Sequence, residues 1–111
     1  MATVSRSDAL WALKKADWFQ LSWGRRPSDG GPDQFCAAGY MMLRQYGPDW
    51  FEARGDLLFP KEDYLETAMD VLTQVANWAE ILGFIRRTHF GETITDVYIF
   101  DQERVSREAR G

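Results

Sequence analysis

The sequence predicts a mainly α-helical fold, in which about four helices pack around one central apolar helix at residues 34–46. Residues 61–82 carry apolar side chains at spacings of three and four, the pattern of an amphipathic helix. Residues 34–46 are apolar on almost every side, which is typical of a helix that its neighbours bury. A length of 111 residues with 45% apolar content fits one compact domain, residues 1–111.

A first helix is expected at residues 8–16, where Ser7 can cap the amino end and two lysines suit the carboxyl end. Residues 18–23 read WFQLSW, and their three aromatic side chains predict a small β element. Glycine and proline then set turns in a loop at residues 24–34.

The central helix at 34–46 has clear signals at both ends. Asp33 can cap its first turn, and Gly47 followed by Pro48 ends it. Gly39 lies in its interior, where glycine costs about 1 kcal/mol of helix stability relative to alanine. We therefore expect another element to approach the helix closely at Gly39.

Residues 48–60 predict an irregular connection with anchoring aromatic side chains. The longest helix follows at 61–82, and Gly83 stops it. The C-terminal part leaves two alternatives open. A β-hairpin at 84–100 fits the β-forming residues on both sides of Gly91. A turn followed by a final helix fits the later residues equally well.

Composition excludes several classes of function. The net charge of −4 argues against non-specific nucleic-acid binding, which needs clustered lysine and arginine. One cysteine and one histidine exclude an internal disulfide and Cys2His2-type zinc sites, and we predict no metal and no cofactor. No apolar run approaches the length of about 18 residues that a transmembrane helix needs, so no membrane partner is expected. The first residues lack the apolar region of a secretory signal, which predicts a cytoplasmic protein.

Cys36 and His89 are the candidate catalytic pair. Cys36 lies at the start of a predicted helix, where the positive end of the helix dipole lowers a thiol pKa. A nucleophilic cysteine also needs a base, and His89 is the only histidine. The surrounding residues, FCAAGYMM, favour the simpler interpretation that Cys36 is buried packing.

Aromatic and charged residues supply the candidate binding surface. The chain holds five tryptophans, more than a core of this size easily buries, and tryptophan often anchors protein interfaces. Trp23 and Trp50 lie beside loops and are expected at the surface. Residues 56–111 hold eleven acidic and six basic side chains, so this half of the chain is acidic. Arg25 and Arg26 could form an anion site if Arg86 and Arg87 lie nearby. The predicted binding residues are Trp23, Arg25, Arg26, Trp50, Glu62, Glu66 and Asp70.

Three short motifs carry a resemblance to a known family. They are Ala16-Asp17-Trp18-Phe19-Gln20, Phe35-Cys36-Ala37-Ala38-Gly39-Tyr40 and Gly91-x-Thr93-x-x-Asp96-Val97. Over residues 7–109 the chain resembles an uncharacterised family of small domains from actinobacteria, other bacteria and phages. The resemblance implies a final helix from about residue 94 and a phage or mobile-element origin, but no activity. The family's Trp-Asn-Asp-x-Pro-Gly turn is replaced by residues 86–91, RRTHFG, so no role of that Asn-Asp pair carries over.

These observations predict a non-enzymatic interaction module. We expect it to bind a protein of a bacterial host or of its own organism, as an inhibitor or regulator of a host or defence protein. One alternative is a thiol hydrolase or transferase that uses Cys36 and His89. Another is a homodimer that buries the aromatic side chains in its own interface.

Overall fold

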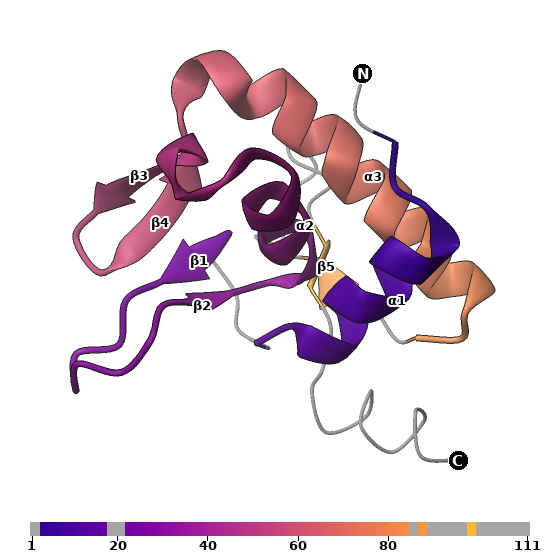
Figure 1. Cartoon of the computed structure of the whole chain (residues 1–111), viewed down its shortest axis with the longest axis horizontal. Helices are drawn as coiled ribbons and strands as arrows, with labels where there is room; N and C mark the ends of the chain where they lie inside the picture. Colours follow the sequence, from indigo (N-terminus) through magenta and orange to yellow (C-terminus); the bar gives the residue numbers. More distant parts are fainter. Residues whose placement is uncertain (1–2, 18–21, 85–86, 89–97, 100–111) are drawn as a thin grey trace.

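The fold combines helices with an antiparallel sheet (Figure 1). The computed structural model describes residues 3–17, 22–84, 87–88 and 98–99. Within these ranges there are three α-helices and a four-stranded sheet in the order β2-β1-β4-β3. The prediction of about four helices is therefore wrong, and the fold is a mixed α/β arrangement. Its main elements are α1 (Arg6–Lys15), β1 (Gly24–Arg25), β2 (Gln34–Phe35), α2 (Ala37–Tyr46), β3 (Phe51–Arg54), β4 (Leu57–Pro60) and α3 (Leu65–Ile81).

Helix α1 begins two residues earlier than expected, because Ser5 rather than Ser7 is its cap. The Ser5 hydroxyl accepts a hydrogen bond from the backbone N–H of Asp8 at 3.2 Å. Ala9, Ala12 and Leu13 form the buried face, so the small side chains let α1 lie close against α2 and α3.

Helix α2 begins three residues later than expected, because residues 34 and 35 belong to β2. Cys36 is the cap in place of Asp33, and its Sγ accepts the Gly39 N–H at 3.4 Å. The helix is the centre of the fold, as its apolar sequence predicts, and lies between the sheet and the other two helices in Figure 1. A Cβ on Gly39 would overlap the carbonyl oxygen of Trp23, which is the close approach that the glycine indicates.

The sheet is built from two hairpins that the sequence did not predict. β1 pairs with β2 across the 26–33 loop, and β3 pairs with β4 across a tight turn at Gly55, where φ is +66°. The β3–β4 hairpin replaces the irregular connection expected at 48–60. Of the small β element expected near 18–23, residues 18–21 lie outside the described ranges, and residues 22 and 23 are not in a strand. The first strand in the described ranges begins at Gly24.

Two short 3-10 turns connect these elements, η1 (Pro48–Trp50) and η2 (Glu62–Tyr64). Because η2 occupies residues 62–64, α3 begins at Leu65 rather than at 61. The buried face of α3 follows the predicted apolar spacing, with Ala68, Val71, Leu72, Val75, Ala76 and Ala79. Among the described residues, no helix combines the length and apolar character needed to cross a membrane.

The C-terminal part contains a second, two-stranded sheet. β5 (Arg87–Thr88) pairs antiparallel with β6 (Tyr98–Ile99), with Arg87 opposite Ile99. The final helix expected from about residue 94 therefore does not run through residues 98 and 99. Arg86, His89 and the rest of the expected helix lie outside the described residues.

Residues 3–5 form a strap that ties the amino end of the chain to α2 and α3. Val4 is buried, its N–H donates to Gln74 Oε1 at 2.8 Å, and its carbonyl oxygen accepts the Trp78 Nε1–H at 2.8 Å. Both partners lie on α3, one turn apart. The strap therefore has a fixed path across the helix pair, beside the pocket described next.

Candidate functional site

Three aromatic rings form a stack where α2, η1 and η2 meet. Trp50 lies between Tyr46 and Tyr64, with ring centroids 3.9 Å and 4.3 Å away and interplanar angles of 19° and 18°. Each ring is the last residue of its element, so the ends of three elements converge here. All three side chains retain partial exposure, and Tyr64 is exposed by 37%.

Local chain geometry brings the three rings together. Gly47, with φ at +87°, ends α2 and turns the chain directly into η1, so Tyr46 and Trp50 are only four positions apart. The β3–β4 hairpin then leaves and returns, and the Lys61 N–H donates to the Trp50 carbonyl oxygen at 3.0 Å. This contact places η2, and with it Tyr64, next to Trp50.

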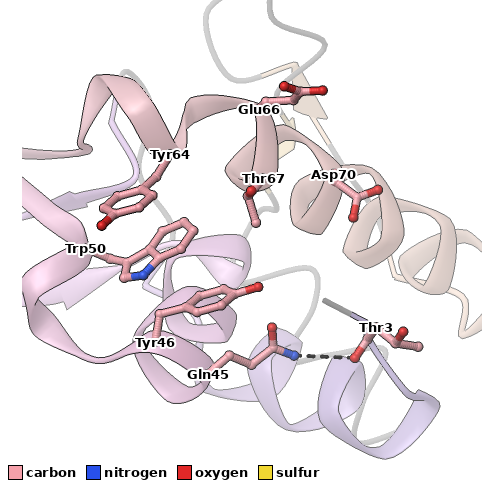
Figure 2. Close-up of a pocket in the computed structure, with 8 residues that line it drawn as sticks. All are labelled: Thr3, Gln45, Tyr46, Trp50, Tyr64, Glu66, Thr67 and Asp70. Atoms are coloured by element: carbon pink, nitrogen blue, oxygen red, sulfur yellow. Dashed lines mark hydrogen bonds between the residues drawn. The ribbon is translucent and has the colours of Figure 1, made fainter. Parts of the chain in front are cut away.

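A hollow of about 750 Å³ opens beside the stack (Figure 2). Its walls come from the strap, α2, η1, η2 and α3, so segments far apart in the sequence share it. We call it the stack pocket. It is lined by Thr3, Gln45, Tyr46, Trp50, Tyr64, Glu66, Thr67 and Asp70.

One wall of the stack pocket is acidic. Glu66 and Asp70 are four positions apart on α3 and therefore share a face of the helix. Figure 2 shows Asp70 and Thr67 directed toward the pocket, with Glu66 at its rim. Asp70 Oδ2 accepts one hydrogen bond, from Gln74 Nε2 at 3.0 Å. In the described ranges, no basic side chain forms an ion pair with either carboxylate.

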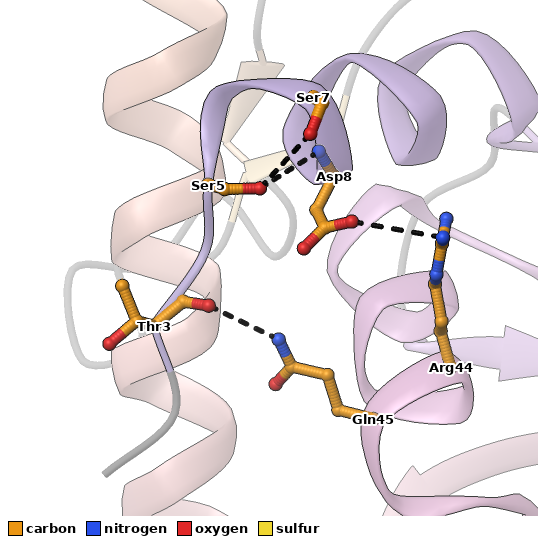
Figure 3. Close-up of polar contacts among 6 residues, drawn as sticks. All are labelled: Thr3, Ser5, Ser7, Asp8, Arg44 and Gln45. Carbon is orange, nitrogen blue, oxygen red and sulfur yellow. Dashed lines mark hydrogen bonds and ion pairs between the residues drawn. The ribbon is translucent and has the colours of Figure 1, made fainter.

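Gln45 joins two walls of the stack pocket. Its Nε2 donates to the Thr3 carbonyl oxygen at 3.4 Å, which ties the strap to α2 (Figures 2 and 3). Its Oε1 is buried and has no hydrogen-bond partner among the described residues.

Helix α1, which follows the strap, is also tied to α2. Asp8, near the start of α1, lies 3.9 Å from an Arg44 nitrogen on α2, and the hydroxyls of Ser5 and Ser7 are 3.3 Å apart (Figure 3). Arg44 in turn lies over the ring of Trp11, 4.4 Å from its centroid. These contacts hold the arginine on the α1 side, so it does not neutralise the acidic wall.

The structure brings together only some of the predicted binding residues. Trp50, Glu66 and Asp70 line the stack pocket, whereas Glu62 is exposed on η2 and is not among its lining residues. The surface position predicted for Trp23 is wrong, since its side chain is only 2% exposed. Its carbonyl oxygen accepts the Cys36 N–H at 3.1 Å, so Trp23 lies at the junction of the sheet and α2, beneath the surface.

Arg25 and Arg26 line a separate hollow of about 440 Å³ at the β1–β2 hairpin. Both arginines already have partners. Arg25 donates to Gln34 Oε1, and Arg26 lies 3.7 Å from the carboxylate of Asp33. Asp29 and Asp56 line the same hollow. Acidic groups thus surround the two arginines, which does not favour the anion site that the sequence suggested.

Cys36 is packed in the interior, 1% exposed, which agrees with the simpler interpretation of the sequence. Burial raises the pKa of its thiol to about 11, and this effect outweighs the hydrogen bond from the Gly39 N–H, which lowers the pKa. Its proposed base, His89, lies outside the described residues. No group of three potential metal-ligating side chains occurs in the part of the chain that the structure describes.

Sequence reasoning missed five lining residues: Thr3, Gln45, Tyr46, Tyr64 and Thr67. The tyrosines carried a weak signal, because Tyr46 precedes the helix-ending Gly47 and Tyr64 follows the turn at Pro60. No sequence signal placed Thr3 or Gln45 beside them.

No family model, no curated protein and no solved structure matches the chain. The family resemblance of its three short motifs therefore stays a prediction.

Proposed function

We propose that the protein is a small acidic interaction module that binds a partner protein through the stack pocket. The observation that carries this proposal is one open hollow that holds an aromatic stack and two carboxylates, neither of which has a basic partner among the described residues. Aromatic side chains concentrate the binding energy of protein interfaces, and charged groups beside them provide specificity and fast association.

The position of the thiol favours binding over thiol chemistry. A nucleophilic cysteine needs access to substrate and a thiolate at working pH, and Cys36 has a buried sulfur with a raised pKa. The stack pocket does not include it. The pocket instead offers rigid ring edges and hydrogen-bond acceptors, a combination that suits recognition.

The partner is proposed to be a bacterial protein. The resemblance to domains of bacteria and phages suggests a host or defence protein, which this chain would inhibit or regulate by occupying its surface. The acidic pocket further suggests that the partner presents a basic segment, because complementary charge steers association.

A blocking substitution inside the stack pocket tests the proposal. Thr67 lines the pocket, and Thr73 is exposed further along the same helix. Thr67→Arg should fill the pocket with a long side chain, while Thr73→Arg adds the same charge outside it. Both variants and the wild type are immobilised, and proteins captured from a bacterial lysate are quantified by mass spectrometry. Each candidate partner is then purified and titrated calorimetrically against all three chains.

The proposal predicts a partner that binds the wild type and Thr73→Arg equally and binds Thr67→Arg at least about tenfold more weakly. Sedimentation velocity on the wild type alone tests the homodimer alternative. A captured set that Thr67→Arg leaves unchanged, or a dimer whose interface Thr67→Arg breaks, would contradict binding of a separate partner through this pocket.

A further inference from the structure

The stack uses both faces of Trp50, which limits what the pocket can bind. The two tyrosines cover the indole at 3.9 Å and 4.3 Å, so no ligand can stack on it without displacing a ring. The three rings are nearly parallel, so the free outer faces of Tyr46 and Tyr64 point away from each other. A cage for a quaternary ammonium ion needs several ring faces converging on one cation, and this arrangement does not supply them.

What the pocket offers instead is a set of hydrogen-bond acceptors. Among the described residues, Asp70 accepts a single hydrogen bond, although a carboxylate has about four acceptor positions. Glu66, on the same helix, stands at the rim of the pocket. The matching ligand is cationic and rich in donors, and its apolar stem can lie along the ring edges.

We propose that the stack pocket binds an arginine side chain of the partner protein, an inference that rests on the proposed function. A guanidinium presents five N–H donors in a planar fork that fits a carboxylate with two parallel hydrogen bonds. Asp70 accepts that fork, and Glu66, one helical turn away, stabilises the same charge from the rim. Lysine offers three donors from a single nitrogen and cannot make the paired contact.

The size of the pocket indicates an arginine within an extended segment. A volume of about 750 Å³ exceeds what one arginine fills, and the strap and the stack bound it at opposite ends. Residues on both sides of the arginine therefore have room to lie between Thr3 and Tyr64. The three methylenes of the side chain pack against apolar ring edges, as long charged side chains commonly do.

Titration with matched peptides tests this inference directly. The probes are acetyl-Gly-Ser-Arg-Ser-Gly-amide and three peptides in which citrulline, lysine or trimethyllysine replaces the arginine. Citrulline keeps the shape of arginine but removes its positive charge. Binding to the full chain is followed by two-dimensional NMR at low ionic strength, using the Trp50 indole N–H and the backbone amides of Thr67 and Asp70. A Trp50→Phe variant assigns the indole signal.

The arginine peptide should move these signals saturably and bind at least about tenfold more tightly than the citrulline peptide. Asp70→Asn should weaken the arginine peptide by a similar factor. Asp56→Asn removes the same charge beside the other hollow and should leave the affinity unchanged within about twofold. Glu66→Gln provides a second variant if Asp70→Asn alters folding, because Glu66 is exposed and its side chain forms no hydrogen bond within the described part of the chain.

The outcomes separate this inference from the proposed function. Equal binding of arginine and citrulline, or a preference for lysine or trimethyllysine, overturns the arginine assignment. If no peptide binds, but a captured partner binds the wild type and not Thr67→Arg, the arginine assignment is wrong and the proposed function still holds. If the arginine peptide binds selectively, but no captured partner loses affinity in Thr67→Arg, the chemistry of the pocket is supported and the protein-binding role is contradicted.

Discussion

The indole N–H of Trp78 donates a hydrogen bond to the carbonyl oxygen of Val4 at 2.8 Å, across 74 positions of sequence. Trp78→Phe keeps a ring at this position but removes the donor and leaves the Val4 carbonyl without it. We expect the free energy of unfolding to fall by about 1–2 kcal/mol. Urea unfolding measures this change, and the amide signals of Thr3 and Val4 should shift while those of the sheet stay in place. Unchanged stability would show that the strap does not depend on this bond.

Gly39→Ala should destabilise the protein even though alanine is the better helix former. Alanine gains about 1 kcal/mol of helix propensity, but its Cβ would overlap the Trp23 carbonyl oxygen and press on the Phe35 side chain. Relieving that overlap moves β1 away from α2, so we expect a net loss of about 2 kcal/mol or more. Thermal and urea unfolding give the sign. A more stable variant would mean that the two backbones are not in close contact.

Tyr40 should make the protein sensitive to alkaline pH. Its hydroxyl donates to Asp17 Oδ2 at 2.7 Å, and burial together with the charge of Asp17 raises its pKa above the ordinary value of 10.0. The unfolded chain loses this proton first, so the stabilisation is complete below about pH 10 and declines as the pH rises further. Tyr40→Phe should cost about 1–2 kcal/mol near neutral pH.

The difference between wild type and Tyr40→Phe should therefore shrink above pH 10. Urea unfolding of both chains at neutral and alkaline pH measures this difference in the free energy of unfolding. Ionisation of lysines and other tyrosines affects both chains alike and cancels in the comparison. A difference that is constant with pH would count against a raised pKa at Tyr40.

Cys36 should resist alkylation in the folded protein. With a pKa of about 11, only about one thiol in a thousand is ionised at pH 8, and the sulfur is buried. We expect iodoacetamide to modify the native chain very slowly and the urea-unfolded chain within minutes, as followed by mass spectrometry. Rapid modification of the native chain would revive the nucleophile hypothesis.

Trp23→Ala and Trp50→Ala should affect different properties. Trp23 is almost fully buried, so its truncation should lower the free energy of unfolding by about 3–5 kcal/mol. Trp50 is partly exposed in the stack pocket, and its truncation should cost about 2 kcal/mol and weaken partner binding by at least about tenfold. Urea unfolding and calorimetric titration measure the two effects. If the Trp23 variant keeps its fold and loses binding selectively, the pocket is not the binding site.

The parts of the fold that the sequence predicted are those with long, regular patterns. α3 repeats its apolar spacing over 17 residues, and α2 is apolar on nearly all sides, so both helices and the central position of α2 were predicted. β1 and β2 have two residues each, too few to show any alternation. Gly55 and Asp56 separate β3 from β4, and Pro60 ends β4; all three residues are typical of loops and turns.

The site was only partly predictable because its residues meet through long-range packing. Aromatic composition and the proximity of a loop indicated Trp50, and helical spacing placed Glu66 and Asp70 together. The same reasoning failed for Trp23, since it did not foresee that the residue next to Trp23 belongs to a sheet strand and that the Trp23 backbone bonds to Cys36. Thr3 reaches the site because Val4 is fixed to α3 by Gln74 and Trp78 and Gln45 bonds to Thr3 itself, contacts that no local pattern encodes.

The parallel rings of Tyr46, Trp50 and Tyr64 give the molecule a built-in optical reporter. Chromophores held this close in a fixed chiral arrangement couple their electronic transitions, so the folded chain should show an intense near-ultraviolet circular dichroism signal. An occupant that leaves the rings in place will barely alter that spectrum, whereas one that wedges them apart will reduce it. Ligands can thus be sorted by how they enter, with no dye or label attached.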